Sequence, residues 1–170
     1  VYDAGRLVAT INPLGFRSTV IYGSSGRRIA SVSPMQRRST TIYDSVGRAV
    51  VSVNPSGLRT TTIYDAGSRP VASIAPTNLR NTTIYGACCN TPAANIAPDG
   101  TRTSFTYNAN RQQIRTTAPT GAISTMVYDV LNRTIASIDP FGKRTSTIYD
   151  AANRPIAGVN ALNQRSTTVY

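Results

Sequence analysis

The chain has 170 residues and a formal net charge of +11, with 18 Lys and Arg against seven Asp and Glu. It contains no histidine and no glutamate, which excludes imidazole or glutamate acid–base catalysis and histidine-based metal sites. No apolar run approaches the length of a membrane-spanning helix. The excess of basic over acidic residues favours polyanionic partners. The positive charge is nevertheless spread evenly along the chain and is not concentrated in one basic arm.

The sequence is one unit repeated eight times. All nine tyrosines lie on a single ladder with steps of 20 to 22 residues. We therefore expect a single repeat array over residues 1–170. Since the chain opens and closes on "VY", in phase with the repeat, and does not begin with Met, we expect it to be an excerpt of a longer polypeptide. The repeats begin near Tyr2, Tyr22, Tyr43, Tyr64, Tyr85, Tyr107, Tyr128 and Tyr149.

In chain order, each repeat starts with a turn just after its tyrosine, as in "DSVGR" at 44–48. An Asp or Asn side chain can cap such a turn by accepting backbone N–H groups, and a Gly or Asn that follows tolerates a left-handed backbone. Asn108 takes the Asp position in the sixth repeat. The predicted turn caps are Asp3, Asp44, Asp65, Asp129 and Asp150.

A second turn follows in each repeat, with Pro and then Gly or Asn two residues later, as in "PSG" at 55–57. Between the turns lie two segments of about six residues that are rich in β-branched side chains, such as 59–64 and 70–75. No apolar period of 3.6 residues is sustained. The pattern predicts an all-β fold of tandem β-hairpins that form a continuous spiralling sheet of about sixteen short strands without a helix.

Alternation along the strands gives two mixed faces. Arg59, Thr61 and Ile63 point to one side, and Thr60, Thr62 and Tyr64 to the other. Each face therefore carries apolar and small polar side chains together, unlike a simple two-layer sandwich. The pattern leaves open which face is inward.

The fifth repeat is irregular. It loses the Asp and Arg of the first turn and gains one residue, which predicts a local bulge or bend. It also holds both cysteines, Cys88 and Cys89, which are adjacent and therefore poorly placed to bridge each other. They are either two small residues in an irregular repeat or a bridge to another segment.

The tandem unit built on "YDxxGR" and "PxG" resembles the YD repeat, also called the Rhs repeat. The matching residues include Tyr43, Asp44, Gly47 and Arg48, then Pro55 and Gly57. The resemblance covers essentially the whole chain. It implies large secreted or surface-exposed proteins, in which β-hairpins spiral into a long sheet. In bacterial Rhs and toxin-complex proteins, the family's sheet forms a hollow shell around a toxic C-terminal region. In wall-associated bacterial proteins and animal teneurins, related repeats serve surface or adhesion roles.

Catalytic residues, cofactors and metal ligands are not predicted. The aspartates mostly occupy equivalent turn positions one repeat apart, so we expect turn caps and not an acid–base pair. Side-chain ligands one repeat apart would lie two strands apart, about 10 Å, which is too far to share one ion. The tyrosines are expected to form a stacked structural column, whose hydroxyl groups would bond to an arginine or aspartate of an adjacent repeat. The members of this column are Tyr22, Tyr43, Tyr64, Tyr85, Tyr107, Tyr128 and Tyr149.

The arginines form two ladders. The first follows the first turn and includes Arg6, Arg27, Arg48, Arg69, Arg111, Arg133 and Arg154. The second precedes the threonine run, beginning at Arg17. The ladder arginines are either solvated or Asp-paired groups that cover strand ends and discourage edge pairing, or a track for an acidic polymer. Nucleic acid is not expected, because no tyrosine lies outside the structural ladder to stack on bases. The polyanion track would comprise Arg38, Arg59, Arg80, Arg102, Arg144 and Arg165.

The Ser/Thr runs are either cross-strand pairs or an O-glycosylated stripe, and Asn81 and Asn132 lie in N-x-S/T motifs. Taken together, the sequence predicts a non-catalytic extracellular or cell-surface structural protein of bacterial origin that forms a filament or stalk. Its expected partners are copies of itself and attached or bound glycans, with no membrane insertion. The alternatives are a wall segment of a hollow Rhs-type shell and an adhesion module for acidic glycans.

Overall fold

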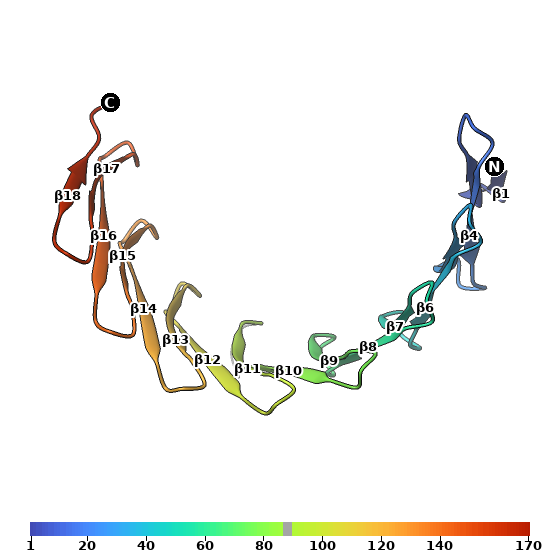
Figure 1. Cartoon of the computed structure of the whole chain (residues 1–170), viewed down its shortest axis with the longest axis horizontal. Helices are drawn as coiled ribbons and strands as arrows, with labels where there is room; N and C mark the ends of the chain where they lie inside the picture. Colours follow the sequence, from blue (N-terminus) through green and yellow to red (C-terminus); the bar gives the residue numbers. More distant parts are fainter. Residues whose placement is uncertain (87–89) are drawn as a thin grey trace. The chain divides into compact units, whose positions relative to one another are not determined.

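The computed structural model describes residues 1–86 and 90–170, so Cys88 and Cys89 lie outside the described residues. Every regular element in these two ranges is a β-strand, and none is a helix (Figure 1). Within the same ranges no helix is long and apolar enough to cross a bilayer. The predicted all-β class is confirmed.

The chain divides into an N-terminal unit, Val1–Thr82, and a C-terminal unit, Thr83–Tyr170. Strand β10, Arg80–Tyr85, contains the boundary. The strands before it are β1 (Tyr2–Asp3), β2 (Arg6–Leu7), β3 (Ala9–Ile11), β4 (Arg17–Tyr22), β5 (Arg28–Val32), β6 (Arg38–Tyr43), β7 (Ala49–Val53), β8 (Arg59–Tyr64) and β9 (Pro70–Ile74). Those after it are β11 (Pro92–Ile96), β12 (Arg102–Tyr107), β13 (Gln113–Thr117), β14 (Ile123–Tyr128), β15 (Thr134–Ile138), β16 (Arg144–Tyr149), β17 (Pro155–Val159) and β18 (Arg165–Thr167).

Strands β3 to β18 follow one another in chain order in a 16-stranded sheet, and β1 and β2 form a separate two-stranded hairpin. The strand pairs with a described register are antiparallel, as short turns require. The predicted number of strands is therefore confirmed. Each repeat contributes one hairpin to the sheet.

Both turns of a repeat use the same backbone design. At the first turn, the N–H of Asp44 bonds to the carbonyl of Arg48 and the N–H of Gly47 to the carbonyl of Asp44, each at 3.0 Å. At the second, Asn54 and Leu58 form the equivalent pair. These are three-residue hairpin loops that close through a left-handed residue, such as Gly47 with a φ of 89°. The same conformation is also forced on three less suited residues, Gln36, Ser68 and Arg111.

A β-bulge accompanies the first turn. Tyr22 pairs with Arg28, whereas Ile21 pairs with Ala30, so Ile29 is an extra residue. The bulge is thus a regular part of the repeat. It recurs beside Tyr43, Tyr64, Tyr107, Tyr128 and Tyr149. The first turn of the fifth repeat, where the sequence predicted a bulge or bend, includes residues 87–89, which lie outside the described residues.

The buried residues form one column at the centres of alternate strands. Larger cross-strand neighbours flank each member; Ala30, for example, lies between Ile21 and Thr40. The accessible surface is 11533 Å², against about 8,100 Å² expected for a globular monomer of 18.1 kDa. Much of both sheet faces therefore stays accessible. In the described residues the buried column comprises Ala9, Ala30, Val51, Ala72, Ala94, Ala136 and Ala157.

Candidate functional site: the inter-repeat clamp and the arginine face

The first turn is stabilised by one aspartate. Oδ1 of Asp44 accepts the backbone N–H groups of Val46 at 3.1 Å and Arg48 at 2.8 Å, while Oδ2 accepts Nε–H of Arg48 at 2.6 Å. The carboxylate therefore caps the turn and orients the arginine. Asp65 binds Arg69 in the same manner, at 2.9 Å to the backbone and 2.7 Å to Nε. Capping and charge pairing thus depend on the same side chain.

The oriented arginine then reaches the next repeat. Nη1 of Arg48 donates to the carbonyl of Asp65 at 3.1 Å and to Oγ of Ser68 at 3.2 Å. Its guanidinium carbon lies 4.9 Å from the ring centroid of Tyr64, a cation–π contact. One side chain therefore links two successive first turns, and we call the Asp–Arg–Tyr arrangement the inter-repeat clamp.

The tyrosine completes the clamp through its hydroxyl group. The Tyr64 hydroxyl donates to the carbonyl of Ala49, fifteen residues earlier, at 3.0 Å. The expected partner, an arginine or aspartate side chain of an adjacent repeat, is therefore wrong, because the hydroxyl satisfies a backbone carbonyl at the bulge. Arginine instead covers the ring. The same fifteen-residue bond is made by Tyr22, Tyr43, Tyr128, Tyr149 and Tyr170.

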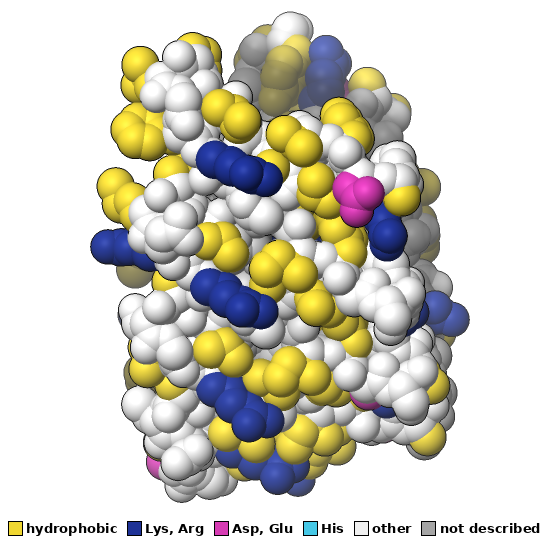
Figure 2. Space-filling model, turned by 90° about the vertical axis from the view of Figure 1, so that its right-hand side faces the viewer, with side chains coloured by type: hydrophobic (Ala, Val, Ile, Leu, Met, Phe, Trp, Pro, Cys, Tyr) yellow, Lys and Arg dark blue, Asp and Glu magenta, His cyan; other side chains and the backbone are white. Residues whose placement is uncertain are grey.

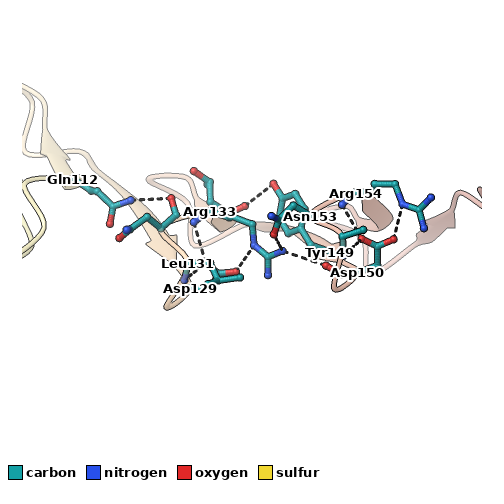
Figure 3. A network of polar contacts seen from close by, with 11 residues as sticks. Gln112, Asp129, Leu131, Arg133, Tyr149, Asp150, Asn153 and Arg154 are labelled. Carbon is teal, nitrogen blue, oxygen red and sulfur yellow. Dashed lines mark hydrogen bonds and ion pairs between the residues drawn. The ribbon is translucent and has the colours of Figure 1, made fainter.

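The clamp recurs in the C-terminal unit (Figure 3). Arg133 bonds to Asp129 Oδ2 at 2.7 Å, reaches the Asp150 carbonyl at 3.3 Å and Asn153 Oδ1 at 2.8 Å, and covers the Tyr149 ring at 4.7 Å. Arg154 binds Asp150 in turn at 2.7 Å. The remaining predicted tyrosines, Tyr85 and Tyr107, end β10 and β12 at the equivalent position and are half-buried.

Hydrogen bonding changes the acidity of the capping aspartates. The backbone N–H of Arg69, followed by its guanidinium, holds the pKa of Asp65 below the ordinary value. The backbone N–H of Arg154 has the leading effect on Asp150, whose pKa is also lowered. Partial burial opposes these effects but is outweighed in both cases. Each carboxylate is therefore stabilised in its charged form by the turn that it caps.

The sixth repeat builds the clamp from neutral groups. Asn108 Oδ1 accepts the Gln112 N–H at 2.9 Å, and Gln112 Nε2 reaches the Asn132 carbonyl at 2.9 Å. Gln112, five residues after its tyrosine, thus takes the position of the ladder arginine. Placing Arg111 in that ladder is wrong, because Arg111 is the left-handed residue of the turn, with a φ of 63°.

Asp3 departs from the predicted role. It pairs directly with Arg6 across a two-residue turn, Ala4 and Gly5, in which both residues have positive φ. In the described residues its exposed carboxylate shows no capping bond, whereas Asp44, Asp65, Asp129 and Asp150 each accept the backbone N–H four residues ahead. Because this turn is shorter, the residue four positions ahead, Leu7, lies within β2 opposite Tyr2 and not at the end of the turn.

Sequence reasoning missed the caps of the second turn. Asn54 Oδ1 accepts the N–H groups of Ser56 and Leu58 at 2.9 and 3.0 Å. Asp139 does the same for Phe141 and Lys143, at 2.9 and 2.8 Å. The available signal was the residue before the proline position, since it is Asn, Ser or Asp at Asn12, Ser33, Asn54, Asp139 and Asn160.

The predicted polyanion track lies apart from the clamp. Its arginines begin the strands that follow the second turns, and each is exposed. Of the two N-x-S/T asparagines, Asn81 is exposed in β10 beside Ser73. Asn132 is exposed in a left-handed turn position, and its Oδ1 accepts Asn110 Nδ2 at 2.8 Å. No His/Cys/Asp/Glu cluster suited to a metal ion occurs among the described residues.

The fold is similar to a part of several solved Tc toxin structures. The chain superposes on the Photorhabdus luminescens Tc holotoxin pore with a TM-score of 0.69 at 10% identity, covering 89% of this chain and 9% of that chain. The TcdB2–TccC3–Cdc42 complex matches with a TM-score of 0.55 at 16% identity, over 92% of this chain and 11% of that chain. TcdB2–TccC3 without its hypervariable C-terminal region matches with a TM-score of 0.54 at 16% identity, over 94% of this chain and 11% of that chain.

The chain thus spans about a tenth of the length of these structures. No family model matches it, and no curated protein does. The structural likeness is consistent with the YD-repeat resemblance and concerns the fold.

Proposed function

We propose that this chain is a non-catalytic wall segment of a hollow shell, of the kind that the resemblance to Rhs and toxin-complex proteins implies. The observation that carries the proposal is the TM-score of 0.69 to a Tc holotoxin over 89% of the chain. On this proposal the chain belongs to a secreted bacterial protein, and the shell encloses a polypeptide such as a C-terminal toxin.

The clamp supports a wall role on physical grounds. A wall one sheet thick cannot rely on a thick apolar core, and here the buried column consists of six alanines and one valine. The repeats must instead be joined by contacts within the sheet. Backbone pairing and the tyrosine hydroxyl bond supply such contacts, and at Arg48 and Arg133 the arginine that reaches the following turn adds to them.

Electron microscopy of the full-length parent protein tests the proposal. Closed hollow particles with internal density that disappears when the region following the repeats is deleted would support a cargo-enclosing wall. Long filaments or stalks in the same preparation would overturn it and favour the filament that the sequence predicts. Solid particles without a lumen would exclude both.

A further inference from the structure

One face of the sheet carries a row of arginines that the clamp does not use. We call these residues the arginine track. None of the seven aspartates lies in a strand of the 16-stranded sheet, because six are in turns and Asp3 is in β1. In the described residues no track arginine forms an ion pair. The track comprises Arg17, Arg38, Arg59 and Arg80 in the N-terminal unit, and Arg102, Arg144 and Arg165 in the C-terminal unit.

A hydroxyl group fixes the direction of several track arginines. Nε of Arg80 donates to Thr82 Oγ1 at 3.3 Å, Nε of Arg102 to Ser104 Oγ at 3.2 Å, and Nε of Arg144 to Ser146 Oγ at 3.1 Å. The guanidinium therefore lies along its own strand, over the residue two positions ahead. Only one of its five N–H donors is used, so its terminal amino groups remain available to a ligand.

The sixth repeat breaks the row but keeps a charge nearby. Ile123 occupies the track position at the start of β14. In the preceding strand, Arg115 occupies the position that other repeats give to the buried alanine column, and it is exposed. Arg115 pairs with Thr125, and Ile123 pairs with Thr117, so Arg115 and Ile123 are diagonal neighbours on the same face. The repeat that lacks a track arginine therefore supplies a guanidinium from the adjacent strand.

Packing does not explain this exchange. A buried alanine is the normal residue at this position, and replacing it with a charged side chain gains no internal partner among the described residues. The exchange does maintain the positive charge of this sheet face. Figure 2 shows a surface of this kind, on which basic side chains follow one another in a row with hydrophobic side chains beside them.

We propose that the arginine track binds an acidic polysaccharide, independently of the proposed wall role. Within each unit, track positions recur every second strand, about 9.6 Å apart. The guanidinium groups of Arg80, Arg102 and Arg144 each lie beside a Ser or Thr hydroxyl, which suits a ligand that presents a carboxylate between neutral, hydroxyl-bearing sugars. The matching polymer carries one carboxylate per disaccharide, because such a chain spaces its charges widely and offers hydroxyl groups between them.

Nucleic acid fits the face less well. Its phosphates recur about every 3.4 Å along a strand of duplex DNA, so roughly three would face each guanidinium. Binding to single strands also depends on aromatic stacking. The tyrosines end their strands on the opposite face, at the bulge, where their hydroxyl groups are bonded to the backbone. Track-face strand positions are occupied instead by Thr, Ser, Val, Ile and Ala, as in Thr40 and Ile42 of β6.

The test uses the whole chain and fluorescently labelled hyaluronan oligosaccharides, which carry one carboxylate per disaccharide, with binding followed by anisotropy at about 0.01 M salt. The double variant Arg38→Gln/Arg59→Gln should weaken binding by roughly twofold to fivefold per arginine removed. The control Arg28→Gln/Arg37→Gln removes the same charge in the same unit, but from side chains on the opposite face, which line a concavity with Ser31 and Ser39. The control should change affinity less than twofold.

A gain-of-binding variant guards against misfolding artefacts. Ile123→Arg completes the row and should tighten binding, and circular dichroism checks that each variant keeps its strand content. Equal weakening by the two double variants would show attraction by net charge alone and would overturn the proposal. So would the absence of binding at low salt, or tighter binding of a thymidine oligonucleotide than of hyaluronan.

Discussion

The Arg48–Tyr64 contact gives a direct measure of how the repeats are held together. Arg48→Met keeps much of the aliphatic stem but removes the guanidinium. It therefore loses the ion pair with Asp44, the hydrogen bonds to the Asp65 carbonyl and the Ser68 hydroxyl, and the cation–π contact at 4.9 Å. At about 0.5–1.5 kcal/mol per hydrogen bond, the two bonds alone predict a loss of roughly 1–3 kcal/mol in unfolding free energy. Tyr64→Leu removes the ring face and the hydroxyl bond to Ala49.

A double-mutant cycle isolates the ring contact from the other losses. We expect the Arg48/Tyr64 coupling energy to be about 0.5–1 kcal/mol, the usual value for a partly exposed cation–π pair. Urea unfolding followed by far-UV circular dichroism provides the four free energies. The equivalent cycle at Arg133/Tyr149, with a distance of 4.7 Å, serves as a replicate in the C-terminal unit.

A cycle between Arg59 and Tyr64 is the control. The two residues lie at opposite ends of β8 and on opposite faces, so their effects should add to within about 0.3–0.5 kcal/mol. If the Arg48/Tyr64 coupling is no larger than this control, the guanidinium does not hold the two repeats through the ring. The clamp would then reduce to the carboxylate cap and the backbone pairing.

Three further predictions use the same unfolding assay. Gly57→Ala should lower the unfolding free energy by about 1 kcal/mol, although no atom lies within 4 Å of the new methyl group, because position 57 has a positive φ. Arg111→Gly should raise the unfolding free energy by a similar amount, because position 111 also has a positive φ. An unchanged urea midpoint for either variant would contradict this. The pKa of Asp65 is lowered in the folded state, so its stabilisation is present above the ordinary value of 3.8 and is lost as pH falls through the folded value. Asp65→Asn should therefore flatten the acid loss of stability, and a parallel pH profile would refute the role of the cap. Asn108→Asp with Gln112→Arg should restore the charged clamp and raise stability by about 0.5–1 kcal/mol, whereas destabilisation would show that the neutral clamp is specifically packed.

Local chemistry explains what the sequence could predict. Pro, Gly, Asn and Asp mark turns because they act through their own backbone angles or through bonds to residues two to four positions ahead. Positions such as Asp44 and Gly57 could therefore be assigned without knowing the fold. Strand content followed in the same way from the β-branched runs between the turns.

The clamp could not be predicted because it depends on register. The bond from Tyr64 to Ala49 joins residues fifteen apart, and the bulge beside the tyrosine decides which carbonyl faces the hydroxyl. A motif on its own does not determine this offset. For Arg111 the needed information was present in the sequence. The other first-ladder arginines from the second repeat onward lie five residues after their tyrosines, whereas Arg111 lies four after Tyr107.

The two arginine ladders differ in how far contacts within the molecule explain why an arginine recurs in them. Each clamp arginine has local partners that explain its recurrence, since Arg48 contacts a carboxylate, a carbonyl, a hydroxyl and a ring. A track arginine such as Arg144 has one hydroxyl of its own strand, which a shorter or neutral donor could also satisfy. Like charges about 10 Å apart repel only weakly at physiological salt, so the row is tolerated, but this gives no reason for its presence. Arg115 sharpens the contrast, because it places a charge on this face at a position that packing assigns to alanine. Contacts within the sheet thus explain the clamp arginines, whereas the track arginines are the ones for which we propose an external partner.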